Sequence, residues 1–508
     1  MEKAIGLTKK DKKRRSLILV SLMLGMFMAS IEATIVATAI PAIVSDLGGF
    51  QLYSWVFSAY LLMNALTILI YGKLSDLFGR KPVFLFGLIV FLAGSLLAGF
   101  ASTMKLLILF RIIQGFGAGA VQPIAMTIVG DIYSMEERAQ IQGYLASVWG
   151  ISAICGPALG GFFVEFLNWS WVFWINLPLG VLSLIGITFF FKENVERKKH
   201  SIDYIGAFLL FISITSLMFV LIQGGVEWSW TSLPILTLIL LFVVGSFLFI
   251  WREQQAKEPV VPLSIWKNPL ISIANLVSLT TGIVTIGLTS FLPSFVQSVM
   301  GQSAIVAGFA LTTMSIGWPI SSTLVGRLLL TKSHRLLVNI GGLALAVGGI
   351  LFVFMTGNNG PLYAAISSFI IGVGMGTTST IFIVLIQNSV PWQMRGAATS
   401  SNMFMRMLGS AIGAALLGGI LNTRLKNFIS QNGAADHLTI NSANAILENQ
   451  DVQLSNHALS VLKRGLEVSL HSVYIGVFIF ALISLLFILV IPKKYLASNN
   501  KQKLKQKG

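Results

Sequence analysis

The sequence has little charge and almost no cysteine for a chain of 508 residues. Only 11% of its residues are charged and 55% are hydrophobic, which excludes an ordinary soluble protein and indicates an integral membrane protein. The single cysteine, Cys155, lies within an apolar run. An intrachain disulfide is therefore excluded, and cysteine usage gives no information about the redox compartment.

Patterns for nucleotide, metal and nucleic-acid binding are also missing. No Walker A motif provides a nucleotide cradle, and His471 has no cluster of cysteine, histidine and carboxylate residues around it to indicate a metal. The net charge of +16 lies in short clusters between apolar runs, not in a basic domain that could hold a phosphate backbone. We therefore expect no enzymatic activity, no metal, no cofactor and no nucleic-acid partner.

Apolar stretches of about 18 residues or more recur along the whole chain, and each is long enough to cross a bilayer as a helix. Fourteen such stretches place both termini on one side. With the N-terminus in the cytoplasm, the inner segments hold 28 of the 35 Lys and Arg residues, so we expect both termini inside. The predicted helices span residues 17–40, 53–71, 83–100, 105–130, 140–163, 171–191, 203–223, 233–251, 270–296, 304–325, 337–355, 362–388, 399–421 and 471–492.

The stretch Gly-Lys-Leu-Ser-Asp-Leu-Phe-Gly-Arg-Lys-Pro at residues 72–82 connects two of these helices at a membrane face. Gly72 and Gly79 allow a tight reversal, and Asp76 with Arg80 can pair or cap helix ends. The order of residues resembles the signature between the second and third helices of the major facilitator superfamily of secondary transporters. This resemblance implies two six-helix bundles that rock around a midplane cavity.

Four further stretches resemble the fourteen-helix drug:proton antiporters of that superfamily. They occur at residues 32–41, 111–117, 150–161 and 171–180, and the stretch Arg-Gly-Ala-Ala-Thr-Ser at 395–400 also fits. The resemblance implies a multidrug efflux transporter of the cell membrane, associated with antibiotic resistance. It would export hydrophobic, cationic compounds by alternating access, with the proton gradient as its energy source. We expect it to act as a monomer.

A weak internal repeat supports two related halves, because the loop at 326–335 resembles a degraded copy of residues 72–82. The helices between the halves are then an insertion. The predicted organisation is a cytoplasmic N-terminus (1–16), an N-terminal six-helix bundle (17–191), two inserted helices (203–251), a C-terminal six-helix bundle (270–492) with an extracellular loop (422–470), and a cytoplasmic tail (493–508).

Glu32 and Arg111 are the candidate proton-coupling residues. Insertion scales put a charged residue at a helix centre at about +2.5 to +3.5 kcal/mol, so burial favours the protonated form of Glu32 unless a nearby cation opposes it. Such a carboxyl group can bind a proton from one side and release it to the other. The alternatives are that Glu32 reaches outside water and orients its helix, and that Arg111 makes a structural hydrogen bond or extends to the interface.

A conformational gate is predicted at the cytoplasmic face. By resemblance, Asp76, Arg80 and Arg138 form a charge cluster around Gly72 and Gly79 that stabilises the outward-open state and breaks during the cycle. The alternative is a set of surface ion pairs, which typically contribute only about 0–1 kcal/mol each.

The stretch at 150–161 resembles the antiporter signature that separates exporters from many importers. Its glycines let a helix approach a neighbour closely, and its proline bends the helix, which suits a joint between the two bundles. Ordinary small-residue packing explains the same composition. The residues of this predicted antiporter helix motif are Gly150, Gly156, Pro157, Gly160 and Gly161.

A broad apolar cavity that stacks on hydrophobic compounds would be lined by aromatic, methionine and polar residues. Packing or lipid contact is the alternative for each of them. The candidate cavity residues are Met28, Tyr60, Gln114, Trp149, Trp318, Phe404 and Arg406.

Two other functions are compatible with the sequence. A lipid or fatty-acid exporter of the same fold would be insensitive to cationic dyes. A membrane receptor or assembly partner that transports nothing would tolerate a neutral replacement of Glu32.

Overall fold

The predicted all-α membrane fold is confirmed. The described residues form helices and no β-strand, apart from an isolated bridge between Gly224 and Trp228. Contacts within the chain define two compact units, called unit 1 and unit 2 below. The structure, a computed structural model, describes residues 9–48, 53–193, 203–224, 228–256, 259, 263–302, 304–329, 331–432 and 456–492.

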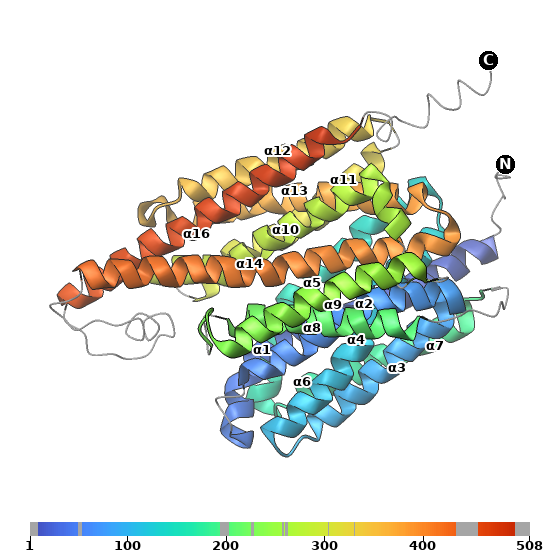
Figure 1. Ribbon diagram of the computed structural model, residues 1–508, viewed down its shortest axis with the longest axis horizontal. Coiled ribbons are helices and arrows are strands. Elements are labelled where there is room, and N and C mark those ends of the chain that lie inside the picture. The colour runs from blue at the N-terminus through green and yellow to red at the C-terminus, as the bar shows by residue number, and fades with distance from the viewer. Residues whose placement is uncertain are drawn as a thin grey trace. The chain divides into compact units, whose positions relative to one another are not determined.

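Unit 1 comprises Met1–Leu217, Ile239–Lys267 and Ile383–Phe404. Its most extensive helix contacts join α3 to α4, α2 to α4 and α1 to α5. The helices of its first segment, visible in blue to green in Figure 1, are α1 (Lys9–Leu47), α2 (Tyr53–Phe78), α3 (Arg80–Gly99), α4 (Met104–Ile132), α5 (Met135–Phe166), α6 (Trp171–Trp174) and α7 (Asn176–Phe190).

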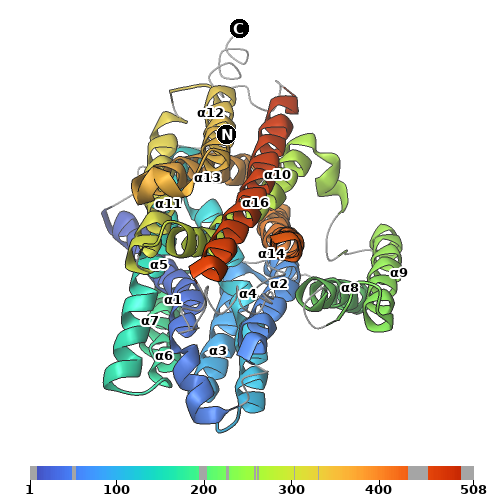
Figure 2. The ribbon, with the colours of Figure 1, turned by 90° about the vertical axis from the view of Figure 1, so that its left-hand side faces the viewer.

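Two helices, α8 (Tyr204–Gln223) and α9 (Leu233–Gln255), follow α7 in the chain. They lie side by side in Figure 2, and Nε of Arg252 in α9 is 3.1 Å from Oδ1 of Asp203, the residue before α8, in an ion pair. Of the helices that could cross a membrane, α9 is the least buried. Its apolar side chains are therefore available to lipid.

Unit 2 comprises Met218–Leu238, Asn268–Phe382 and Met405–Gly508. Here α16 packs against α10 and α12, and Tyr474 of α16 lies between the rings of Phe295 and Phe352 in the core. The end of α13 and the first turns of α14 belong to unit 1. The remaining helices are α10 (Pro269–Ser294), α11 (Ala304–Leu328), α12 (His334–Val353), α13 (Gly360–Ser389), α14 (Arg395–Asn432) and α16 (Asn456–Val490).

The reversal between α2 and α3 follows from its residues. Gly79 has a φ of 97°, a conformation that favours glycine, and it separates the two helices. The carboxylate of Glu193 accepts hydrogen bonds from the backbone N–H groups of Arg80 and Lys81, each at 2.8 Å. These are N–H groups that a helix N-terminus leaves without an intrahelical partner, so Glu193 fixes the start of α3.

Each of the fourteen predicted spans falls on a helix of the structure, the sixth on the pair α6 and α7. Eleven of the described helices are long and apolar enough to cross a membrane. The predicted spans at 140–163, 203–223 and 304–325 lie on α5, α8 and α11, which are not among the eleven. The count of fourteen transmembrane helices therefore stays a prediction.

The connection predicted as a loop at 422–470 is shorter in the structure. Helix α14 continues to Asn432 and α16 begins at Asn456, while residues 433–455 lie outside the described part of the chain. The added segments, 422–432 of α14 and 456–470 of α16, have a low mean hydropathy, but each carries apolar residues at four-residue spacing. These residues form one face of the helix, which packs against the core. The buried members of these faces are Leu425, Ile429, Leu462, Leu466 and Leu470.

The predicted antiporter helix motif packs inside unit 1. A Cβ atom added at Gly156 would lie 2.0 Å from Oγ1 of Thr34, and one added at Gly160 would lie 1.9 Å from Oγ1 of Thr38. Gly161 faces open space instead. Gly156 and Gly160 therefore allow α5 to lie close against α1, as small-residue packing requires. A role as a joint between the halves stays a prediction.

This packing gives a paired test. Gly156→Ala should lower the melting temperature of the purified protein, because overpacking of about 1–3 kcal/mol outweighs the gain in helix propensity of about 1 kcal/mol. Gly161→Ala should leave the melting temperature equal or raise it. Equal melting temperatures for the two variants would contradict the close approach of α5 to α1.

Candidate functional site

Glu32 of α1 and Arg111 of α4 form a fully buried ion pair in unit 1, in which Nη1 of Arg111 donates to Oε1 of Glu32. The same Nη1 donates to Oε1 of Gln114 at 2.7 Å, and Nε donates to the carbonyl of Val56 at 2.9 Å. The ring of Tyr60 lies against the guanidinium, with its centroid 4.2 Å from Cζ. Arg111 is therefore held by a carboxylate, an amide, a carbonyl and an aromatic face.

The other carboxylate oxygen is held by a second hydrogen-bond network. Nδ2 of Asn176 donates to Oε2 of Glu32 at 2.6 Å and to Oγ of Ser95 at 2.9 Å. Nε2 of Gln114 also donates to Oγ of Ser95, at 3.1 Å, and this hydroxyl donates to the carbonyl of Phe173 at 2.7 Å. Residues from α1, α3, α4, α6 and α7 thus converge on one buried acid.

The network still has hydrogen-bonding capacity. Nη2 of Arg111, the hydroxyl of Tyr60 and Oδ1 of Asn176 are buried and have no hydrogen-bond partner among the described residues. Removing one partner of a buried ion pair typically costs about 3–5 kcal/mol, because the other charge is left uncompensated. A proton on Glu32 would remove its charge and so weaken the attraction to Arg111.

A second charged cluster lies where α2 meets the start of α14. The carboxylate of Asp76 accepts hydrogen bonds from the N–H groups of Gly396 at 2.9 Å and Ala397 at 2.8 Å, which satisfies the N-terminus of α14. Nη2 of Arg80 lies 2.7 Å from Oδ1 of Asp76. A Cβ atom added at Gly72 would meet Oγ of Ser400 at 2.2 Å, so this glycine is needed for the close approach.

Arg80 is fully buried and makes polar contacts on several sides. It donates to the carbonyl of Ser75 at 2.6 Å, the carbonyl of Trp392 at 2.8 Å and Oδ2 of Asp131 at 3.1 Å. Its Cζ lies 4.1 Å from the centroid of the Trp392 ring. This arrangement differs from an exposed surface ion pair, whose contribution is small.

Asp131 extends the cluster to a second arginine. Nη1 of Arg395 donates to Oδ1 of Asp131 at 3.0 Å, and Nε of Arg395 donates to the carbonyl of Gln387 at 3.1 Å. Arg138, the third predicted gate residue, donates to Oδ1 of Asn388 at 3.0 Å. The cluster therefore joins α2, α3, α4 and α5 to the end of α13 and the start of α14, all within unit 1.

Of the predicted cavity residues, Tyr60 and Gln114 join the Glu32–Arg111 pair. Met28 is buried against α7, where a Cβ atom at Gly180 would lie 2.9 Å from its Sδ. Trp149 is 40% exposed and Phe404 is half-buried.

The remaining two predicted cavity residues form a separate pair in unit 2. The Cζ of Arg406 lies 5.7 Å from the centroid of the Trp318 ring, within the range of a cation–π interaction. The structure therefore divides the predicted cavity residues between the two units.

Sequence reasoning did not assign roles to Ser95, Asn176, Asp131, Gln387 or Trp392. Asn176 lies within the stretch at 171–180 that resembles the drug-export branch, so that motif contained a signal for it. Polar residues within apolar spans were a signal for Ser95 and Gln387. Asp131 lies in the last turn of α4 and Trp392 in the short connection between α13 and α14, and nothing in the sequence identifies their partners.

Residues 22–414 match the Major Facilitator Superfamily. The chain belongs to this superfamily. It is 40% identical over 403 residues to Multidrug resistance protein 3 of Bacillus subtilis (strain 168), covering 79% of each chain. It is 34% identical over 516 residues to the Multidrug transporter protein MdtP of the same organism, covering 96% of this chain and 95% of that one. The predicted family membership is confirmed.

Solved structures agree on the fold of this superfamily member. The proton:xylose symporter XylE aligns with a TM-score of 0.61 at 12% identity, covering 97% of this chain and 99% of that one. The human organic anion transporter MFSD10 aligns with a TM-score of 0.62 at 14% identity, covering 93% and 99%. Membership of this superfamily makes the protein a multi-pass membrane transporter.

The shared role of Asp131 can be measured with a double-mutant cycle. Asp131→Asn and Arg395→Gln should each lower the free energy of unfolding, and the double variant should lose less than the sum of the two. The expected coupling energy is about 0.5–3 kcal/mol, as for residues in one ion-pair network. Lys81→Gln provides a control, since Lys81 donates through Nζ to the carbonyl of Thr188 instead. Additive losses for Asp131 and Arg395 would contradict the network.

Proposed function

We propose that this transporter exports hydrophobic, cationic compounds from the cytoplasm in exchange for protons, by alternating access. The names of its relatives, which include multidrug resistance and multidrug transporter proteins, support this substrate class. The placement of Lys and Arg supports cytoplasmic termini in a cell membrane. Energy comes from the proton gradient, whose electrical part supplies about 2.3 kcal/mol per charge per 100 mV, and no cofactor takes part.

The buried Glu32–Arg111 pair is the observation on which this proposal rests. In the proposed cycle, Glu32 is ionised while it pairs with Arg111 and becomes neutral when it binds a proton. Arg111 then keeps the amide of Gln114, the carbonyl of Val56 and the ring of Tyr60 as its contacts. Because intramembrane acids are expensive and functional by default, a purely structural role for Glu32 is the weaker explanation.

The cluster around Asp76 would serve as the cytoplasmic gate. Asp76 satisfies the N-terminus of α14, and Arg80 with Arg395 joins the neighbouring helices through Asp131. Breaking these contacts exposes charges and helix-end N–H groups that need new partners, so the closed arrangement is stabilised until protonation and substrate binding offset the cost. The outward-open state is the one in which we propose that this cluster is intact.

Transport in proteoliposomes with an imposed pH gradient tests the proposal. The intact protein should transport ethidium only when the gradient is present. Glu32→Gln should lower gradient-driven transport more than tenfold, because it removes the titrating group and leaves Arg111 without a carboxylate. Glu32→Asp should retain gradient dependence, since it keeps a carboxylate one methylene shorter.

Gel filtration and melting temperature would confirm that each variant folds. Normal gradient-driven transport by Glu32→Gln would show that Glu32 is not the proton carrier. If the intact protein moved fluorescent lipid but no cationic dye, the lipid-export alternative would replace drug export. Absence of both activities in folded protein would favour a receptor or assembly role.

A further inference from the structure

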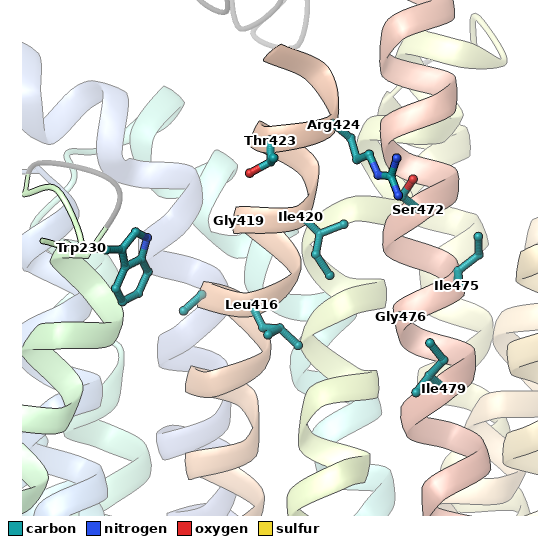
Figure 3. A pocket seen from close by; sticks show the side chains of 11 residues that line it. Trp230, Leu416, Gly419, Ile420, Thr423, Arg424, Ser472, Ile475, Gly476 and Ile479 are labelled. Carbon is teal, nitrogen blue, oxygen red and sulfur yellow. The ribbon is translucent and has the colours of Figure 1, made fainter. Parts of the chain in front are cut away.

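A groove on unit 2 is lined by none of the residues of the buried ion pair or the charged cluster. It has a volume of about 560 Å³, within the range of roughly 300–1,000 Å³ that is typical of small-molecule sites. Figure 3 shows its lining from α14 and α16, with Trp230 contributed by the segment before α9. The exposed apolar side chains include Leu416, Ile475 and Ile479, so the groove opens on the apolar surface of the helices.

The polar groups of this groove lie at one end. Figure 3 shows Arg424 extending from α14 toward Ser472 of α16, with Thr423 on the same turn of α14. Arg424 is exposed and forms no hydrogen bond or ion pair with any described residue. Further along α14 and α16 the lining is apolar or glycine. The groove thus has a cationic end and an apolar body.

The length of α14 places this end at a definite depth. Arg395 lies in the charged cluster at one membrane face, and Arg424 follows 29 residues later on the same helix. At 1.5 Å per residue this distance is about 44 Å, close to the full bilayer thickness of about 40–45 Å including headgroups. Arg424 therefore reaches the opposite headgroup layer, where Trp230 also suits the membrane–water interface.

The apolar body matches one leaflet in length. From Arg424 to Ala415 the groove follows α14 for nine residues, about 14 Å, and half of the hydrocarbon core is about 15 Å.

The residues around the Arg424 end of the groove carry mostly positive charge. Across α14 and α16 near this end, the described charges are Arg424, Lys426, Lys463, Arg464 and a single acid, Glu467.

We infer that this groove binds an anionic phospholipid of the outer leaflet. The phosphate pairs with Arg424, for which planar guanidinium groups are well suited, and Ser472 and Thr423 can donate to headgroup oxygens. One acyl chain lies along Leu416, Ile475 and Ile479. Charge complementarity favours an anionic lipid over a cationic drug, which Arg424 would repel.

Glycines on α14 provide a matched pair for testing the groove. A Cβ atom added at Gly419, which lines the groove, would meet no atom within 4 Å, and the same is true of Gly418, which does not line it. Gly419→Leu should therefore fill the groove without a clash. Gly418→Leu makes the same change to the helix outside the groove.

Native mass spectrometry of the full-length protein in detergent would measure binding of phosphatidylglycerol and phosphatidylcholine. The first phosphatidylglycerol should bind roughly tenfold more tightly than phosphatidylcholine, the difference expected for one charge-assisted contact. Arg424→Gln should remove this preference, while Arg424→Lys and Lys426→Gln should retain most of it. Gly419→Leu should weaken binding of both lipids, while Gly418→Leu should not.

Three results would overturn the inference. They are a phosphatidylglycerol preference that survives both Arg424→Gln and Gly419→Leu, equal binding of the two lipids by the unaltered protein, and binding of glycerol 3-phosphate as tight as that of the whole lipid. The readout is lipid retention by folded protein and does not depend on proton-coupled export. Failure of the lipid site would therefore be distinguishable from failure of the proposed transport function.

Discussion

Every charge inside the apolar interior of this protein needs a partner, because the bilayer offers no water to compensate it. Unit 1 meets this constraint twice. Glu32 of α1 and Arg111 of α4 neutralise each other in a fully buried pair, and Asp76, Arg80, Asp131 and Arg395 do so where α2 meets the start of α14. A proton is one of the few alternative partners that a buried carboxylate can accept. The carboxylate that compensates the charge of Arg111 is therefore also the group that could bind a proton.

The partners of Glu32 also determine which helices its charge state can affect. Asn176 begins α7 and donates to both Glu32 and Ser95, while Ser95 of α3 receives a further hydrogen bond from Gln114 of α4. Neutralising the acid weakens the attraction to Arg111 and the charge-assisted bond from Asn176 together. The effect is thus distributed over α1, α3, α4 and α7 and does not depend on a single side chain.

Much of the architecture could be predicted from the sequence, since apolar runs of membrane-spanning length are long and strongly patterned. All fourteen predicted ranges fall on helices, and the residues that turn α2 into α3 are those of the 72–82 stretch. The helical extensions beyond 421 and before 471 were missed because their mean hydropathy is low. Their four-residue apolar spacing, from Leu425 to Ile429 and from Leu462 to Leu466, was the available signal.

The candidate site was predictable in its charged members but not in its pairing. An acid or arginine within an apolar run is conspicuous, and this is why Glu32 and Arg111 could be named, whereas Asp76 was named from the 72–82 stretch. The other members of the two networks, Ser95, Asn176 and Asp131, are common polar residues that only tertiary packing brings near the charges. Their identity depends on helix rotation and depth, which one sequence does not specify.

The two units differ in the chemistry that their described residues can perform. In unit 2 these residues include one acid, Glu467, which pairs with Arg464 near the start of α16. Arg406 rests on the ring of Trp318, a contact worth about 0.5–2 kcal/mol, and arginine stays protonated in proteins. Glu467 is partly exposed and Arg406 has no carboxyl group, so neither provides a buried carboxyl group that could exchange a proton during transport. Among the described residues, the proton coupling that we propose therefore depends on the acids of unit 1, of which Glu32 is fully buried.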